Sequence, residues 1–195
     1  AHRFAGSGDR AAIASLVYEA LRLRASSIFG MGFSEEDADT ARAQMLGMLI
    51  RKMPLTEIND QFSGARFAPE PLSEAERERL ADWSLDGAPS HVAGDYPAWL
   101  EPELARAFGA RLVDEMRALS ARAPVDVRVN TLKTLRAKLL PDLLHFNARE
   151  TPFSPTGLRF DPGEGGRGPA LQVTEAFIKG QFEIQEEGSQ LVTLL

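Results

Sequence analysis

The stretch PVDVRVN, residues 124–130, marks a change in the periodicity of the chain. Valine at every second position alternates with Asp126, Arg128 and Asn130. A period of two is typical of a half-buried β-strand, with apolar side chains toward a core and polar ones toward solvent. The stretch therefore predicts a strand at the point where helical patterning gives way to a second kind of structure.

Further strands and helices are predicted after this strand. Thr134 is a candidate cap for the next helix, and Pro141 should kink or restart it. The predicted elements are a helix over 135–146, short strands at 150–154 and 157–160, a helical segment near 174–179 and a strand at 181–185. The order strand, helix, strand, strand, helix, strand is that of the ferredoxin-like and RRM-like folds.

The chain before this strand is predicted to be helical throughout. Six helices with short loops indicate an all-α bundle over residues 1–123. Ser73 and Glu76 form a capping-box pattern at the start of one helix. Another helix is predicted to begin near Pro97, with Trp99 and Leu100 facing inward. The fold class is thus an all-helical bundle followed by a small α+β subdomain.

Composition limits the classes of function that the chain can serve. The net charge is −6, with 14 basic and 19 acidic side chains in residues 1–123 and 8 and 9 in residues 124–195. Neither part has the bulk basic character of a stand-alone nucleic-acid binder. There is no cysteine and no apolar run of the ~18 residues that a membrane span needs, and no signal peptide is visible. We expect a cytoplasmic protein without disulfides or cysteine-bound metals.

Other candidate chemistry is weak. The loop GEGGRG, residues 163–168, has proline on both sides rather than a strand before it and a helix after it, so we expect a surface loop and no phosphate site. The histidines have no metal-ligand spacing, and no metal site is predicted.

The polar face of the first strand is the candidate RNA-binding surface. Arg128 and Asn130 lie on that face, and Lys133 follows just after the strand. Such groups can contact RNA phosphates or base edges. The face lacks the paired aromatic residues that RRM domains use for stacking, and an ordinary solvated sheet face is the alternative interpretation.

Several stretches together resemble the RsmB/Sun (Fmu) family of bacterial ribosomal RNA cytosine-C5 methyltransferases. They occur in the order of that family and cover most of the chain. The stretches are RFAGSGDRAAIASLVYEALR near the start, PAWL at 97–100, VRVNTLK at 127–133, SPTGLRF at 154–160 and GQFEIQEEGSQLVTLL at 180–195. The combination of RVNTLK with G-x-F-x-x-Q-x-E-G-S-Q-L is the most specific part.

The resemblance implies a NusB-like helical RNA-binding domain over 1–123 and an RRM-like α+β subdomain over 124–186. Residues 187–195 would then begin a Rossmann-like methyltransferase domain that is absent from this chain. That domain would bind S-adenosylmethionine outside these residues and would be the intramolecular partner of the apolar C-terminal segment. Ribosomal RNA, of the small subunit, is the implied substrate. The family's chemistry needs a cysteine thiolate, so this chain alone should be inactive.

A second interpretation is a non-enzymatic NusB-like RNA- or protein-binding module of a transcription antitermination complex. The α+β half and the apolar C-terminus argue against it, because a NusB protein is only the helical bundle. A third, an unrelated helical scaffold with an α+β appendage, explains none of the resembling stretches.

Overall fold

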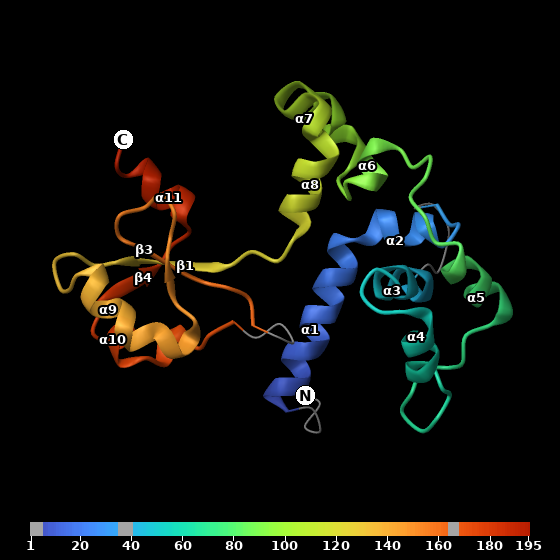
Figure 1. Ribbon diagram of the computed structural model, residues 1–195, viewed down its shortest axis with the longest axis horizontal. Coiled ribbons are helices and arrows are strands. Elements are labelled where there is room, and N and C mark those ends of the chain that lie inside the picture. Colours follow the sequence, from blue (N-terminus) through green and yellow to red (C-terminus); the bar gives the residue numbers. More distant parts are fainter. Residues whose placement is uncertain (1–5, 35–40, 164–167) are drawn as a thin grey trace. The chain divides into compact units, whose positions relative to one another are not determined.

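The computed structural model describes residues 6–34, 41–163 and 168–195 and divides the chain into two compact units (Figure 1). One unit, Ala14–Ala121, is helical. The other comprises Arg122–Leu195 together with the chain up to Ile13, and it contains the sheet. The predicted fold class, a helical region followed by a small α+β domain, is confirmed.

The helical unit is built from short helices joined by short loops. They are α1 (Ser7–Arg22, shared with the other unit), α2 (Arg24–Gly30), α3 (Ala41–Leu49), α4 (Leu55–Gln61), α5 (Glu74–Ala81), α6 (Ser90–Ala93), α7 (Glu101–Phe108) and α8 (Leu112–Ser120), with 3-10 turns at Ala98–Leu100 and Gly109–Arg111. None of the helices in the described ranges has the length and apolar character that crossing a membrane would require.

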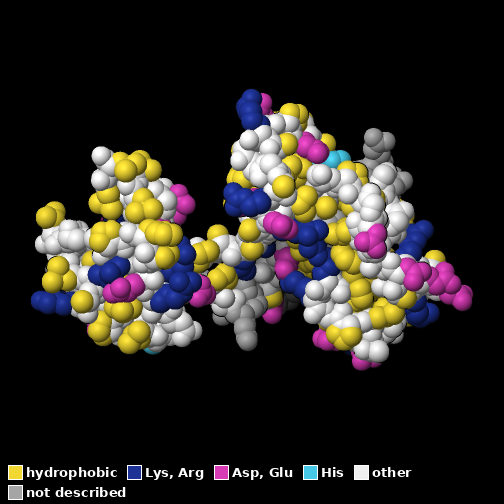
Figure 2. Space-filling view, turned by 45° about the horizontal axis from the view of Figure 1, so that its top comes forward, with side chains coloured by type: hydrophobic (Ala, Val, Ile, Leu, Met, Phe, Trp, Pro, Cys, Tyr) yellow, Lys and Arg dark blue, Asp and Glu magenta, His cyan; other side chains and the backbone are white. Residues whose placement is uncertain are grey.

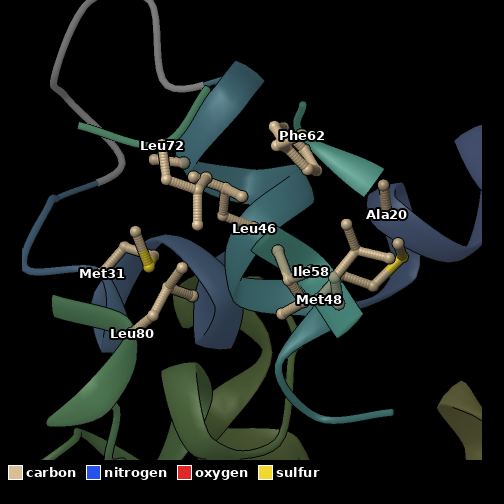
Figure 3. Close-up of a cluster of buried hydrophobic side chains, with 10 residues drawn as sticks. Ala20, Met31, Leu46, Met48, Ile58, Phe62, Leu72 and Leu80 are labelled. Carbon is tan, nitrogen blue, oxygen red and sulfur yellow. The ribbon is translucent and has the colours of Figure 1, made fainter. Parts of the chain in front are cut away.

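The main core of the helical unit lies around α3. Leu46 and Met48 of α3 and Ile58 of α4 are fully buried, and side chains from α1 and α5 converge on them (Figure 3). Burying one such side chain contributes about 1.5–3 kcal/mol. Met45 and Met53 are partly buried and pack against the same cluster.

A glycine permits α2 and α3 to approach closely. A Cβ at Gly47 would lie 2.2 Å from the backbone oxygen of Ser27, which is itself fully buried. No larger side chain fits there without separating the two helices, so the packing of this pair depends on Gly47.

The sequence predicts some helical details correctly and others wrongly. The Ser73–Glu76 capping box is present, with Glu76 N donating to Ser73 Oγ and Ser73 N donating to Glu76 Oε2. Trp99, by contrast, is 77% exposed, so its inward assignment is wrong. It lies in the 3-10 turn that precedes α7, and the inward face of α7 is instead formed by Leu104 and Phe108.

The α+β unit contains a four-stranded antiparallel sheet with strand order β2-β3-β1-β4. Its elements are β1 (Val125–Val129), α9 (Arg136–Leu143) with a 3-10 turn at Leu144–Phe146, β2 (Arg149–Glu150), β3 (Gly157–Phe160), a 3-10 turn at Leu171–Val173, α10 (Glu175–Ile178), β4 (Phe182–Ile184) and α11 (Glu187–Val192). The predicted order of strands and helices is confirmed.

One face of the sheet forms the core of this unit. Val127 and Val129 of β1, Leu158 and Phe160 of β3 and Phe182 of β4 are fully buried or nearly so. Helices α9 and α10 cover this face and contribute further apolar side chains, among them Leu139 and Leu143 (Figure 1). The alternating valines of the first strand therefore face the core, as their spacing predicts.

Some predicted boundaries in this unit are wrong. β2 ends at Glu150, because residues 151–156 form a loop rather than a strand. Helix α9 begins after Leu135 with no side-chain cap, so Thr134 does not cap it, and Pro141 lies inside the helix. Four residues of the predicted Gly-rich loop, 164–167, lie outside the described residues, as do residues 35–40 of the part predicted to be helical.

The observed burial predicts opposite outcomes for two substitutions in the helical unit. Ile58→Ala should lower the free energy of unfolding by about 2–5 kcal/mol, because it empties a fully buried site. Trp99→Ala should change it by less than about 0.5 kcal/mol, because the indole is mostly exposed. Urea denaturation of both variants measures the difference, and a large loss in Trp99→Ala would restore the inward assignment.

Candidate nucleic-acid interface

The second face of the sheet, opposite α9 and α10, carries a buried ion pair. Asp126 of β1 lies directly opposite Arg159 of β3 in the strand register. The Arg159 guanidinium donates from Nε and Nη2 to the two carboxylate oxygens of Asp126, each at 2.7 Å. These hydrogen bonds raise the pKa of Arg159. Asp126 is only 6% exposed, so its prediction as a solvated residue is wrong.

Glu187 extends this pair to helix α11. Its backbone N–H donates to Asp126 Oδ2 at 3.1 Å, and its carboxylate lies 3.4 Å from Arg159 Nη2. The other oxygen, Oε1, accepts from the N–H groups of Phe153 at 2.6 Å and Ser154 at 2.7 Å. Burial would raise the pKa of Glu187, but the hydrogen bonds from Ser154 and Phe153 and the charge of Arg159 outweigh it and lower the pKa.

Further hydrogen bonds join α11 to the β2–β3 loop. Ser154 Oγ donates to Gln190 Oε1 at 2.7 Å, and Gln190 Nε2 donates to the backbone oxygen of Gln185 at 2.8 Å. Gly157 leaves room for Gln190 and Thr151, since a Cβ there would lie 3.0 Å from Gln190 Oε1 and 2.2 Å from Thr151 Oγ1. Ser154 and Gln190 are both buried.

Helix α11 therefore covers part of the face that an RRM-like sheet uses for RNA. The covered part includes Asp126 and Gly157, at the centre of the sheet. Arg128 remains exposed near the end of β1, with Gly157 and Glu183 as its neighbours across the strands. Of the polar residues that β1 presents on this face, Arg128 is the one left accessible to a ligand.

The other two predicted RNA-binding residues make contacts within the protein. Asn130 Nδ2 donates to the backbone oxygen of Gly180 at 3.0 Å, and its Oδ1 accepts from Leu132 N at 3.2 Å. Lys133 Nζ donates to the backbone oxygen of Lys179 at 2.7 Å. Both residues join the β1–α9 loop to the turn before β4. Lys133 is still exposed, whereas both ends of the Asn130 amide have partners.

A separate cleft of 460 Å³ lies between the end of α9 and α10. His145, Glu175 and Lys179 line it, and Glu175 pairs with Lys179 at 2.5 Å. Its charges are of both signs and offer no defined ligand chemistry. In the described part of the chain no group of histidine and acidic residues has a geometry that could hold a metal ion.

Comparison with known proteins bears on this unit and on the helices before it. Residues 96–163 match the family model described as the ferredoxin-like domain of RsmF/B-like methyltransferases. The resemblance to this family is confirmed. The matched region begins in the helical unit, includes α7 and α8, and runs through β3.

Comparisons with solved structures and with curated protein sequences give no further family assignment. The crystal structure of PH0851 is similar over 88% of this chain and 38% of its own, with 19% identity and a TM-score of 0.47. The chain thus spans well under half the length of that protein. No curated protein sequence matches the chain.

The sequence analysis did not identify three residues of this network and its loop, which are Arg159 and Phe153, inside the matched region, and Glu187, beyond it. Arg159 and Glu187 lie in the stretches SPTGLRF and QEEGSQL, so the resemblance marked them without indicating their contacts. Phe153 is an aromatic residue in a segment predicted to be a strand, where its 74% exposure was not expected.

The network predicts an acid-sensitive contribution of Glu187 to stability. Glu187→Gln should lower the free energy of unfolding at pH 7 by about 1.5–3 kcal/mol, because it weakens hydrogen bonds to a charged group. The folded-state pKa of Glu187 is lowered, so the contribution of the carboxylate is full above its unfolded pKa of about 4.3 and is lost as the pH falls through the folded pKa. The difference from wild type should therefore shrink in acid.

Glu186→Gln is the matched control for this measurement. Glu186 is exposed, and its carboxylate accepts a hydrogen bond from Ser189 Oγ that a glutamine oxygen can also accept. This variant should lie within about 0.5 kcal/mol of wild type in urea denaturation at each pH. Equal stability of the two variants would show that Glu187 does not organise the unit.

Proposed function

We propose that this chain is the RNA-positioning part of an S-adenosylmethionine-dependent methyltransferase that modifies cytosine C5 in small-subunit ribosomal RNA. The observation that carries the proposal is the match of residues 96–163 to the ferredoxin-like domain of RsmF/B-like methyltransferases. The sheet that follows α8, with its four strands in the order β2-β3-β1-β4, is consistent with that domain.

The proposal assigns these residues to binding rather than to chemistry. A methyltransferase that acts on a base needs that base turned out of its stack, and appended domains can supply the backbone contacts that fix its position. Attack on cytosine C6 requires a thiolate, and these 195 residues include no cysteine. The nucleophile would therefore come from outside this sequence. Ribosomal RNA would be the partner, and the cytoplasm the location.

The described residues do not fit S-adenosylmethionine. A nucleotide-type cofactor is commonly held where a strand leads through a glycine-rich turn into a helix N-terminus. Here β3 is followed by Pro162, and the next described element is the 3-10 turn Leu171–Val173. We assign the cofactor to residues outside this chain and derive no step through it.

A NusB-like module of an antitermination complex is the alternative function. A NusB protein is only the helical bundle, so this interpretation does not account for the α+β unit, which makes up more than a third of the chain. The family match includes β1, α9, β2 and β3 and therefore favours the methyltransferase assignment.

The first expected result concerns RNA binding, which should be weak, sensitive to salt and dependent on Arg128. Fluorescence anisotropy with a small-subunit ribosomal RNA hairpin at low salt should show binding by wild type and weaker binding by Arg128→Ala. Because Arg128 can neutralise one phosphate, the slope of log K against log salt should fall in magnitude by about 0.7. Lys133→Ala is less informative, since it also removes the contact with Lys179.

Lys138→Ala is the control for this experiment. Lys138 is an exposed cation of α9, on the helix-covered side of the sheet, so its loss changes the net charge equally without changing the candidate surface. Equal weakening by the two variants would mean that only net charge matters. Absence of binding by wild type would contradict the proposed function.

The second expected result concerns the cofactor. Isothermal titration of the chain with S-adenosylmethionine should give no saturable heat, because the described residues provide no cofactor loop. A dissociation constant in the micromolar range would place a cofactor site within this chain and would contradict the division of labour proposed here.

A further inference from the structure

Three loops lie together at one end of the sheet. β1 ends there, while β3 and β4 begin there, as the pairing of Val129 with Phe182 and the hydrogen bond from Val129 N to Thr156 O require. We call this surface the loop end; it consists of residues 130–136, 151–156 and 177–181. Side chains join the loops: Asn130 and Lys133 donate to the turn at 179–180, and Arg136 Nη1 donates to the backbone oxygen of Ser154 at 2.9 Å.

Each loop exposes at least one large apolar side chain, and the first loop exposes two, since Leu135 is 55% exposed. Leu132 is 95% exposed, and Phe153 and Ile178 are each 74% exposed. The loop end also contains three cations, Lys133, Arg136 and Lys179, and no acidic residue, although the whole chain has a net charge of −6. On the visible surface of this unit as a whole, at the left of Figure 2, basic, acidic and apolar side chains are interspersed.

The backbone that presents Phe153 is fixed although its ring is exposed. The N–H groups of Phe153 and Ser154 both donate to the buried Glu187 carboxylate, and the Ser154 side chain donates to Gln190. A ligand that contacts the ring therefore does not have to order the loop, and it gains the contact at a low entropic cost.

We propose that the loop end binds single-stranded RNA, with a base stacked on Phe153 and phosphates held by the surrounding cations. Proteins that bind single strands combine an aromatic surface with a cationic groove in this way. Phe153 would supply the stacking contact that the sheet face lacks. The inference rests on the proposed function and specifies where RNA is contacted.

The cations favour RNA over a protein as the occupant of this surface. Lysine is depleted at protein–protein interfaces, whereas a polyanion needs it. Arg136 and Lys179 each pair with one acid outside the loops, Glu150 at 2.9 Å and Glu175 at 2.5 Å. Among the described residues, Lys133 contacts a backbone oxygen and no acidic side chain. Lys133 is therefore the loop cation that can neutralise a phosphate without first breaking an ion pair.

Variants at position 153 test the stacking contact. The probe is an unpaired RNA of about 12 nucleotides, in the size range that single-strand sites cover. Phe153→Ala and Phe153→Leu should each weaken its binding by about 5- to 150-fold in fluorescence anisotropy, because both remove the ring. Phe153→Trp should retain the wild-type affinity, since indole stacks at least as well. Val173→Ala, which alters another exposed apolar residue of this unit, should bind as wild type does.

The outcomes separate this inference from the proposed function. Because the Phe153 side chain is exposed, all variants should keep the wild-type circular dichroism and thermal midpoint. If wild type binds the strand and Phe153→Ala binds it equally, or if Phe153→Leu retains full affinity, the stacking contact is refuted and the proposed function stands. If wild type binds no RNA, the proposed function fails. Self-association that is lost in Phe153→Ala without any change in RNA affinity would identify the surface as a protein contact and overturn the inference.

Discussion

The α+β unit depends on the Asp126 carboxylate, which accepts hydrogen bonds from both the Arg159 guanidinium and the backbone N–H of Glu187. Asp126 lies in β1, Arg159 in β3 and Glu187 at the start of α11, so one acidic group holds two strands and a helix together. A buried charge is costly unless its partners are all present, and removal of one partner typically destabilises a protein by about 3–5 kcal/mol. The network thus fixes where α11 lies, and α11 in turn fixes the β2–β3 loop through Glu187 and Ser154.

The stretches that carry the family resemblance contact one another in the folded unit. VRVNTLK reaches the start of GQFEIQ through Asn130 and Gly180, and SPTGLRF reaches QEEGSQL through Ser154 and Gln190. Their polar residues form hydrogen bonds inside the protein and so define an architecture. Under the proposed function, these residues would build the surface on which RNA is positioned, and the chemistry would be carried out by other residues.

Local sequence patterns predicted the helices and strands. The burial and the partners of the polar residues depend on contacts between residues far apart in the sequence, which local patterns do not contain. The period of two in β1 is a property of five consecutive residues, and it correctly placed the valines in the core. The burial of Asp126 depends on Glu187, 61 residues away, and no local pattern contains that contact. The same limit applies to the candidate site. Arg128 is exposed as expected, but the partners of Asn130 and Lys133 lie near residue 180.

The position of α11 also determines how RNA could be bound. An open RRM-like sheet offers a broad face to a single strand, but here its centre is covered by α11, so the accessible polar and aromatic groups lie at the margin. Few cations are available there, and the chain as a whole is acidic, so under the proposed function long-range attraction would contribute little and short-range contacts would have to fix the RNA. A small, rigid and weakly charged surface suits a domain that sets the register of a substrate, because affinity can come from elsewhere while orientation requires a fixed geometry.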